Sequence, residues 1–238
     1  MPGMAATLKA LRRSLRDRGV RGTVRRALAE PFYRYDDWRF DVRFRVQTSG
    51  VVEAGDLDYG EDDRRHGSNY QPVRLGGFAE FMRALPIRHE EFTFIDFGCG
   101  KGRALLMASE FPFRRIVGVE LSPALCRIAA RNVQTYSSPS QKCTRLEISC
   151  ENAMAYPLPD DPAVLYFFNP FDESVMRSVL ANICLSWSAH ARPLFVVLYN
   201  PVLDPLLEQS DFLRLFRRTR DSSIYQALTS AAPLPSST

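Results

Sequence analysis

Residues 92–120 have the sequence FTFIDFGCGKGRALLMASEFPFRRIVGVE, from which the fold class can be predicted. FTFID is a short apolar run typical of a buried strand, and GRALLMASE, which follows a cluster of glycines, predicts a helix. RIVGVE predicts a second buried strand. A strand, a glycine turn, a helix and another strand form the repeating unit of a parallel sheet that helices cover on both faces.

The same alternation continues toward the C-terminus. Ser122-Pro123 predicts the start of a helix, with serine as the N-cap and proline in the first turn. The last two strands follow each other without a helix between them, so we expect one antiparallel hairpin at the sheet edge. The prediction comprises helices at 75–85, 102–110, 123–134 and 173–185, and strands at 92–96, 115–120, 144–150, 163–168, 193–199, 212–218 and 222–228.

The chain divides into three parts by composition. Residues 1–70 are a basic N-terminal extension, residues 71–229 are the predicted α/β domain, and residues 230–238, rich in Ser, Ala and Pro, are expected to be a disordered tail. No internal repeat is found in the sequence.

The extension carries most of the positive charge. Residues 1–45 hold twelve Lys or Arg against five Asp or Glu, and residues 5–30 have the apolar spacing of an amphipathic helix. We interpret this helix as packed on the domain with a solvated basic face; contact with an anionic surface and an organelle transit peptide are the alternatives. Within residues 40–46, Phe and Val alternate with polar residues, which predicts a strand or an extended arm.

Composition narrows the class of protein. The chain has 238 residues, of which 45% are hydrophobic and 24% charged, as in an ordinary globular domain. Its apolar stretches are too short to span a bilayer, and no secretory signal is expected at the N-terminus. Five cysteines without a CxxC pair favour a reducing, cytoplasmic location. The three histidines lack ligand spacing, so no metal is expected.

The turn after the first strand predicts a binding site for a nucleoside. Gly98, Gly100 and Gly102 permit a tight turn at the carboxyl end of the strand, and Glu120 ends the next strand, where a carboxylate can bind ribose hydroxyls. Asp96 would repel a diphosphate but would help to hold an ammonium or sulfonium group. The charges therefore favour S-adenosyl-L-methionine over a nicotinamide dinucleotide, whose binding fingerprint has a different glycine spacing.

These residues resemble a known family. FIDFGCGKGRALLMA and IVGVELSPALCRIAARN are similar to the first two motifs of class I S-adenosylmethionine-dependent methyltransferases. The resemblance implies a Rossmann-like, doubly wound, seven-stranded sheet of order 3-2-1-4-5-7-6 with strand 7 antiparallel. It also implies that the glycine turn lies at the methionine end of the cofactor and that the acid of the second strand binds the ribose. The turn residues concerned are Asp96, Gly98, Cys99, Gly100 and Gly102.

Two residues after the third strand are the candidates for adenine binding. The family usually has Asp-Ala at this point, and here Asn152-Ala153 follows Glu151. An asparagine keeps an acceptor oxygen for the adenine amino group, and the Ala153 amide can donate to the ring. The alternative is that Asn152 only caps a turn.

The loop after the fourth strand is the candidate catalytic site. Asn169-Pro170-Phe171 resembles the [DN]-P-P-[YFW] motif of amino-methyltransferases, one proline short. The resemblance implies that the asparagine oxygen and the next backbone carbonyl hold an amine while the aromatic ring packs over it. A turn without function is the alternative, because a second Asn-Pro, Asn200-Pro201, follows the fifth strand.

The sequence thus predicts a methyltransferase that transfers a methyl group in line to a nitrogen of a protein or a small molecule. The alternatives are an O-methyltransferase, a nicotinamide dehydrogenase, and a non-catalytic protein that binds nucleic acid through the arginine-rich extension, which is not favoured. Tyr59, His66 and Tyr70 are a further guess for a lid, based only on their position ahead of the first motif.

Overall fold

The computed structural model describes residues 31–58, 60 and 68–228. The helix predicted at residues 5–30 and the tail at 230–238 lie outside these residues. The division of the chain at residue 70 stays a prediction.

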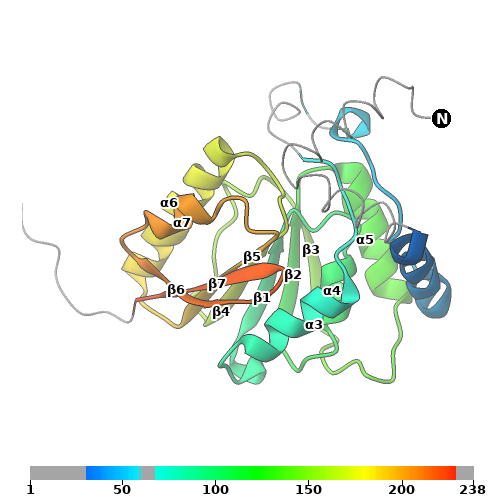
Figure 1. Ribbon diagram of the computed structural model, residues 1–238, viewed down its shortest axis with the longest axis horizontal. Helices are drawn as coiled ribbons and strands as arrows, with labels where there is room; N and C mark the ends of the chain where they lie inside the picture. Colours follow the sequence, from blue (N-terminus) through cyan, green and yellow to red (C-terminus); the bar gives the residue numbers. More distant parts are fainter. Residues whose placement is uncertain (1–30, 59, 61–67, 229–238) are drawn as a thin grey trace, which may run out of the picture.

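A single seven-stranded sheet forms the centre of the described structure, with the strand order β3-β2-β1-β4-β5-β7-β6 (Figure 1). The first five strands in this order are parallel to one another, and β7 runs antiparallel to both β5 and β6. The predicted fold, order and antiparallel hairpin are therefore confirmed. The strands are β1 (Thr93–Phe97), β2 (Arg115–Glu120), β3 (Leu146–Cys150), β4 (Ala163–Phe167), β5 (Leu194–Tyr199), β6 (Leu213–Arg218) and β7 (Ser222–Ala227).

Helices cover both faces of this sheet, which makes it doubly wound (Figure 1). One face carries α3 (Leu75–Ala84), α4 (Arg103–Ala108) and α5 (Pro123–Thr135), and the other carries α6 (Glu173–Ala189) and α7 (Asp204–Glu208). The side chain of Ser122 accepts a hydrogen bond from the Leu125 amide, so the predicted N-cap of α5 is confirmed. The five-residue helix α7 was not predicted, because a helix this short has no recognisable apolar period.

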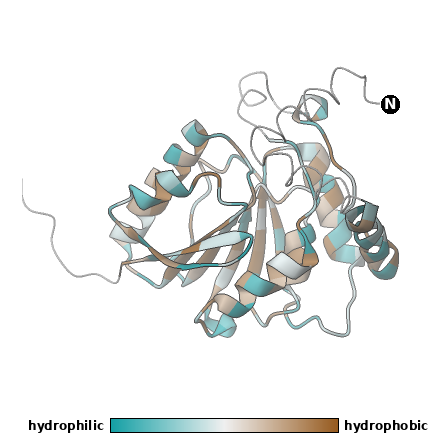
Figure 2. Cartoon of the chain, in the orientation of Figure 1, coloured by the Kyte–Doolittle hydropathy of each residue, from teal (hydrophilic) through white to brown (hydrophobic). Residues whose placement is uncertain are grey.

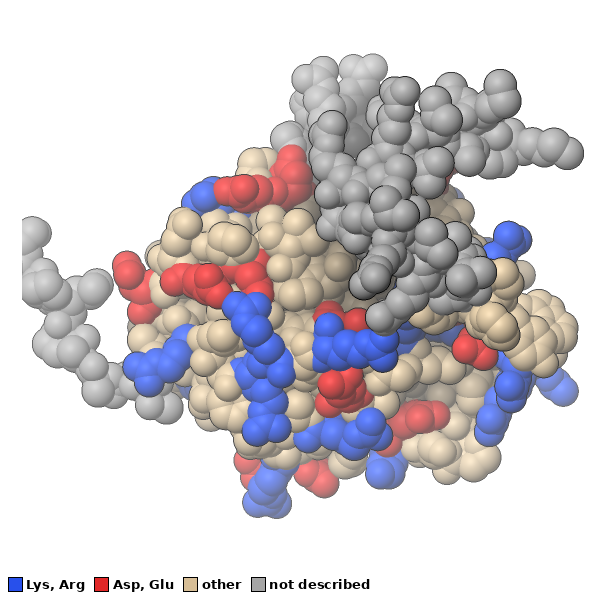
Figure 3. Space-filling model, in the orientation of Figure 1, with Lys and Arg blue, Asp and Glu red and all other residues tan. Residues whose placement is uncertain are grey.

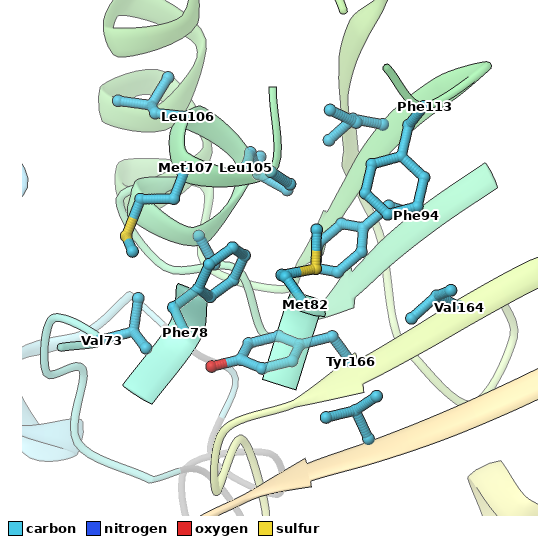
Figure 4. Close-up of a cluster of buried hydrophobic side chains, with 14 of the residues drawn as sticks. Val73, Phe78, Met82, Phe94, Leu105, Leu106, Met107, Phe113, Val164 and Tyr166 are labelled. Atoms are coloured by element: carbon cyan, nitrogen blue, oxygen red, sulfur yellow. The ribbon is translucent and has the colours of Figure 1, made fainter. Parts of the chain in front are cut away.

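The central strands are buried on both faces, and successive side chains therefore enter two different cores. Phe94 and Val164 lie in the core beneath α3 and α4, whereas Ile95 and Leu165 lie in the core beneath α6. Figure 2 shows these strands as predominantly hydrophobic. Figure 4 shows the first core, where aromatic and aliphatic side chains from α3, α4, β1 and β4 meet. This rigid sheet fixes the ends of β1, β2 and β4, from which the site is built.

The predicted strand or arm at residues 40–46 is wrong, because residues 31–44 are helical. We call this segment the N-terminal helix. Phe40 and Phe44 lie four residues apart and pack against Tyr136, with ring centroids 6.5 and 5.0 Å from its ring. Val42, which completed the apparent alternation, is exposed. The buried positions are thus four residues apart, as in a helix. The strand prediction failed because it counted the exposed Val42 as buried.

The N-terminal helix also holds the loop that follows it. The Asp41 carboxylate accepts hydrogen bonds from the amides of Thr48 and Ser49 at 2.9 and 2.8 Å. It also accepts one from the Thr48 hydroxyl at 2.6 Å. The Thr48 carbonyl in turn accepts a hydrogen bond from the Tyr70 hydroxyl at 2.6 Å. The extension is thereby connected to the segment that leads into the domain.

Candidate active site

The glycine turn connects β1 to α4 in a conformation that favours glycine. Gly98, Gly100 and Gly102 have φ angles of +76°, +56° and +82°. The amides of Gly98 and Cys99 donate to the Val119 carbonyl at 2.8 and 3.1 Å, which holds the turn against β2. The predicted turn is therefore present at the carboxyl end of the first strand, where ligands of open α/β sheets bind.

Two of the glycines lie against side chains that line the cavity. A Cβ at Gly98 would lie 2.4 Å from the Cβ of Pro170, and a Cβ at Gly100 would lie 2.1 Å from the Tyr70 ring. The missing side chains thus make room for Pro170 and Tyr70, which form walls beside the turn. Gly102 does not line the cavity; it precedes α4 and lies against Ala129 of α5. The Cys99 side chain is buried against Gly118.

Glu120 connects the end of β2 to the glycine turn. One carboxylate oxygen accepts a hydrogen bond from the Gly100 amide, and the other accepts one from the Ser122 amide, both at 2.9 Å. Burial raises the pKa of Glu120, and these amide donors oppose the rise. Each oxygen keeps a lone pair, so the carboxylate can also accept from ribose hydroxyls as predicted.

Asp96 places a buried acid at the same edge of the sheet. Its residue is 3% exposed and lines the cavity next to Gly98. Burial raises the pKa of Asp96 well above its usual range, and the nearby Glu120 raises it further. No ion pair with Asp96 is found among the described residues. A cationic group bound here would stabilise the ionised carboxylate, which fits an ammonium or a sulfonium ligand.

Asn152 caps a turn in the loop after β3. Its side-chain oxygen accepts a hydrogen bond from the Met154 amide at 2.9 Å, as the alternative interpretation of this residue expected. Asn152 and Ala153 nevertheless both line the cavity. An amide oxygen accepts two hydrogen bonds, so the turn leaves one acceptor position for a base.

The predicted catalytic loop follows β4 and reaches the same cavity. Asn169 has a φ of +46°, a left-handed conformation that asparagine adopts more readily than most residues. The carbonyl of Pro170 accepts a hydrogen bond from the Ser68 amide at 3.4 Å. The Phe171 ring packs edge-on against Phe167, with centroids 6.1 Å apart. No hydrogen bond holds the Asn169 side chain within the described part of the chain.

One cavity at the carboxyl edge of the sheet brings these residues together. Ten of the eleven predicted site residues line it, and Gly102 is the exception. The ten are Asp96, Gly98, Cys99, Gly100, Glu120, Asn152, Ala153, Asn169, Pro170 and Phe171.

Sequence reasoning missed several residues of the cavity. Tyr166, at the register position of Asp96 on the neighbouring strand, lines it with a buried hydroxyl that has no partner among the described residues. Arg103 also lines it; its guanidinium lies 2.5 Å from the Asp37 carboxylate and stacks over Phe40. Neither residue belongs to the motif pattern, and the partners of Arg103 lie more than sixty residues away in the chain.

The lid hypothesis concerns three residues, of which the structure describes one. Tyr70 lines the cavity, packs against Gly100 and donates its hydroxyl to Thr48. These contacts make it a wall of the cavity. Tyr59 and His66 lie outside the described residues. No cluster of three or more His, Cys, Asp or Glu side chains suitable for a metal is found among the residues described.

The comparisons with known proteins agree with this geometry. Residues 94–185 match the family model described as a methyltransferase domain. This match covers the glycine turn, the acid of β2, the turn after β3 and the loop after β4. A comparison with curated proteins finds no significant match.

Solved structures with a related fold are distant in sequence. A dimethyladenosine transferase from Plasmodium falciparum is 10% identical, with a TM-score of 0.48 over 68% of this chain and 64% of that chain. A predicted N6-adenine-specific DNA methylase from Listeria monocytogenes is 12% identical, with a TM-score of 0.49 over 67% and 52%. An RNA methyltransferase from Salinibacter ruber, in complex with S-adenosyl-L-homocysteine, is 13% identical, with a TM-score of 0.47 over 69% and 97%. The chain spans less than two thirds of the first two, and none of these likenesses bears on substrate or mechanism.

The sheet order and the site define a class I, Rossmann-like methyltransferase domain. Residues 94–185 match a methyltransferase domain model, so this part of the chain is an S-adenosylmethionine-dependent methyltransferase domain. S-adenosyl-L-methionine is the cofactor of this class, and the match does not support the dehydrogenase alternative.

Proposed function

We propose that the domain transfers the methyl group to a nitrogen atom of its substrate. The observation that carries this proposal concerns Asn169, which lines the same cavity as Gly98 and Asp96 and whose side chain has no hydrogen bond from the described residues. Its amide oxygen is an acceptor that an amine N–H can use. The Pro170 carbonyl is a second acceptor, because its one long hydrogen bond to Ser68 leaves a lone pair free.

Two acceptors that bind the hydrogens of an amine also orient its lone pair. When bound, S-adenosyl-L-methionine supplies a methyl group on a positively charged sulfur. The contribution of the protein is then mainly to position the amine and to exclude water. Pro170 supports this role, because its ring lies against Gly98 and fixes the loop relative to the glycine turn. Phe171 covers the apolar side of the loop through its contact with Phe167.

Asp96, Glu120 and Asn152 would hold the cofactor in this proposal. Glu120 would accept from the ribose hydroxyls, Asp96 would lie near the cationic methionine end, and the Asn152-Ala153 turn would bind the adenine edge. The support is their convergence on one cavity from the ends of β1, β2 and β3. We favour a protein side chain or a small amine as the acceptor over a nucleic acid, because no aromatic side chain interleaves with the arginines of residues 5–30.

The test transfers a labelled methyl group from S-adenosyl-L-methionine to fractionated cell extract. Alkali treatment of the product separates nitrogen transfer from carboxyl-oxygen transfer, because methyl esters hydrolyse and methylamines do not. Asn169→Ala should lower the rate of transfer about 100-fold or more, since positioning contributes several kcal/mol to such reactions. Cofactor affinity, measured by calorimetry, should change little.

The chain offers a matched control in its second Asn-Pro dipeptide. Asn200 also has a positive φ, +58°, and does not line the cavity. Asn200→Ala introduces the same backbone strain, so it should retain full transfer. Equal losses in both variants, or a product that alkali destroys, would contradict the proposal and favour a structural role or an O-methyltransferase.

A further inference from the structure

The N-terminal helix has a second apolar face, opposite the one that packs on the domain. Its members recur at helical spacing and point away from Phe40. All are more than half exposed: Phe32 72%, Tyr35 55%, Trp38 56% and Val42 58%. The rings of Tyr35 and Trp38, in the middle of this face, lie 5.9 Å apart. We call these four residues the outer stripe.

Most charges of the helix are sorted between its two faces. At about 100° per residue, Arg34 lies on one flank of the outer stripe and Arg39 and Arg43 on the other. Asp37 and Asp41 turn inward, to Arg103 and to Thr48, and Asp36 is the one acid of the helix that is exposed. The exposed side of the helix is therefore aromatic and has more basic than acidic side chains. Figure 3 shows uncharged side chains protruding between basic ones at the right edge, where Figure 1 places this helix.

Tryptophan and tyrosine flanked by arginine are the composition of helices that lie in a membrane interface. The rings and Val42 enter the region between headgroups and acyl chains, and the arginines bind lipid phosphates at the edge. The preceding residues add to this attraction, because residues 1–30 contain eight Lys or Arg and two acidic residues. Among the described helices none is long and apolar enough to cross a membrane.

Other occupants fit the outer stripe less well. A two-fold contact with a second copy would bring the arginines of one helix against those of the other, which like-charge repulsion opposes. A nucleic acid would satisfy the arginines and stack on the rings, but it leaves Phe32 and Val42 without an apolar partner.

We propose that the outer stripe docks the protein on the surface of an anionic lipid bilayer. The aromatic side chains supply apolar burial, and Arg34, Arg39 and Arg43 supply the preference for anionic headgroups. This interaction surface is separate from the cofactor cavity, and it does not depend on the nature of the methyl acceptor.

Tryptophan fluorescence of the full-length protein tests this directly. The chain has two tryptophans, so Trp187→Phe leaves Trp38 as the only reporter. Vesicles of phosphatidylcholine with phosphatidylglycerol should shift the emission of Trp38 to shorter wavelength and sediment the protein. Vesicles of phosphatidylcholine alone should do much less, and added salt should reduce binding because part of the attraction is electrostatic.

A matched pair of variants assigns the binding to the outer stripe. Val42→Asp should weaken binding to the anionic vesicles roughly tenfold, because it removes apolar burial and adds a negative charge. Leu185→Asp on α6 makes the same kind of change at a residue that is 71% exposed, and it should bind like the wild type. Both variants leave residues 1–30 unchanged.

Three outcomes would overturn the proposal. The first is an emission of Trp38 that anionic vesicles do not shift. The second is equal binding by Val42→Asp and the wild type, which would place the contact elsewhere. The third is a shift caused by an oligonucleotide and not by vesicles, which would assign the stripe to nucleic acid.

Discussion

Asp96 is a carboxyl group held where water barely reaches it, beside a second acid. At neutral pH the unfolded chain ionises this group easily, whereas burial and Glu120 raise its pKa in the folded state. The folded state therefore loses stability as the pH rises from the ordinary carboxyl pKa toward the raised one. Such a cost fits the proposed role of Asp96 in binding the cationic end of the cofactor.

We expect Asp96→Asn to have opposite effects on stability and on cofactor binding. The cofactor-free variant should melt at a higher temperature than the wild type at neutral pH, by roughly 2–4 °C for each kcal/mol gained. Its affinity for S-adenosyl-L-methionine should fall at least about tenfold, because no charge faces the cation. Thermal denaturation and calorimetry measure the two effects.

The pH dependence of binding provides the control for Asp96. Wild-type affinity should weaken on acidification, starting above the usual carboxyl pKa, because the raised pKa of Asp96 lets it take up a proton early. Asp96→Asn should show a flatter profile, with Glu120 responsible for the remainder. An unchanged affinity in this variant would mean that Asp96 does not contact the cofactor.

The site residues that lie at strand ends could be predicted from local sequence patterns. Gly98 and Glu120 follow from the short-range pattern of strand, turn and acid, and both lie where the pattern predicts. The Tyr70 ring lies against Gly100 although thirty residues separate them, and no local period shows such a contact. For Asn152 the sequence could not decide between two roles, because asparagine suits both a turn and the binding of a base.

At the scale of elements, α3 contains two adjacent glycines with different surroundings. A Cβ at Gly76 would meet nothing within 4 Å, whereas a Cβ at Gly77 would lie 2.3 Å from the Tyr199 hydroxyl and 2.7 Å from the Asp221 carboxylate. Alanine substitutions at these two positions therefore distinguish two effects on stability: the helix propensity of alanine at Gly76, and the packing of α3 against the end of β5 at Gly77.

We expect Gly76→Ala to raise the free energy of unfolding by about 0.5–1 kcal/mol, since alanine loses less backbone entropy in a helix. Gly77→Ala should lower it by about 1–3 kcal/mol, because Tyr199 or α3 must shift. Urea denaturation with an unchanged slope measures both. A stabilised Gly77→Ala would show that Tyr199 moves at little cost.

All seven strands were predicted from the sequence. β2 has the predicted bounds, because charged residues, Arg115 and Glu120, mark both ends of its apolar run. The N-terminal helix was missed because its buried residues share a segment with the exposed outer stripe, so hydrophobic side chains occur on both sides of it. In such a helix the pattern of apolar and polar residues cannot distinguish the helical period from an alternation.

At the scale of the whole molecule, one buried ion pair joins the extension to the domain. Arg103, the first residue of α4, is 2% exposed and pairs with Asp37, whose carboxylate is partly accessible. Burial raises the pKa of Asp37 in spite of its arginine partner. Removing the carboxylate alone leaves a guanidinium buried without an anion, which costs more than the net value of the pair.

We expect Asp37→Leu to lower the free energy of unfolding by about 2–3 kcal/mol. The double variant Asp37→Leu with Arg103→Met should recover part of this loss, because it removes the uncompensated charge as well. Asp36→Leu, a neighbour on the exposed side of the helix, serves as the control and should change stability little. A loss as large at Asp36 would assign the effect to the helix and not to the ion pair.

The hydrogen bonds around Asp41 connect the N-terminal helix to the cofactor cavity. Asp41 holds Thr48, Thr48 holds Tyr70, and Tyr70 rests on Gly100. A shift of the N-terminal helix, which would contact lipid, would therefore also shift Tyr70, a wall of the cofactor cavity. Should docking change the affinity for cofactor by some factor, thermodynamic reciprocity requires cofactor to change the affinity for lipid by the same factor. The affinity for lipid, measured with and without cofactor, and the affinity for cofactor, measured with and without lipid, would then give the same coupling free energy.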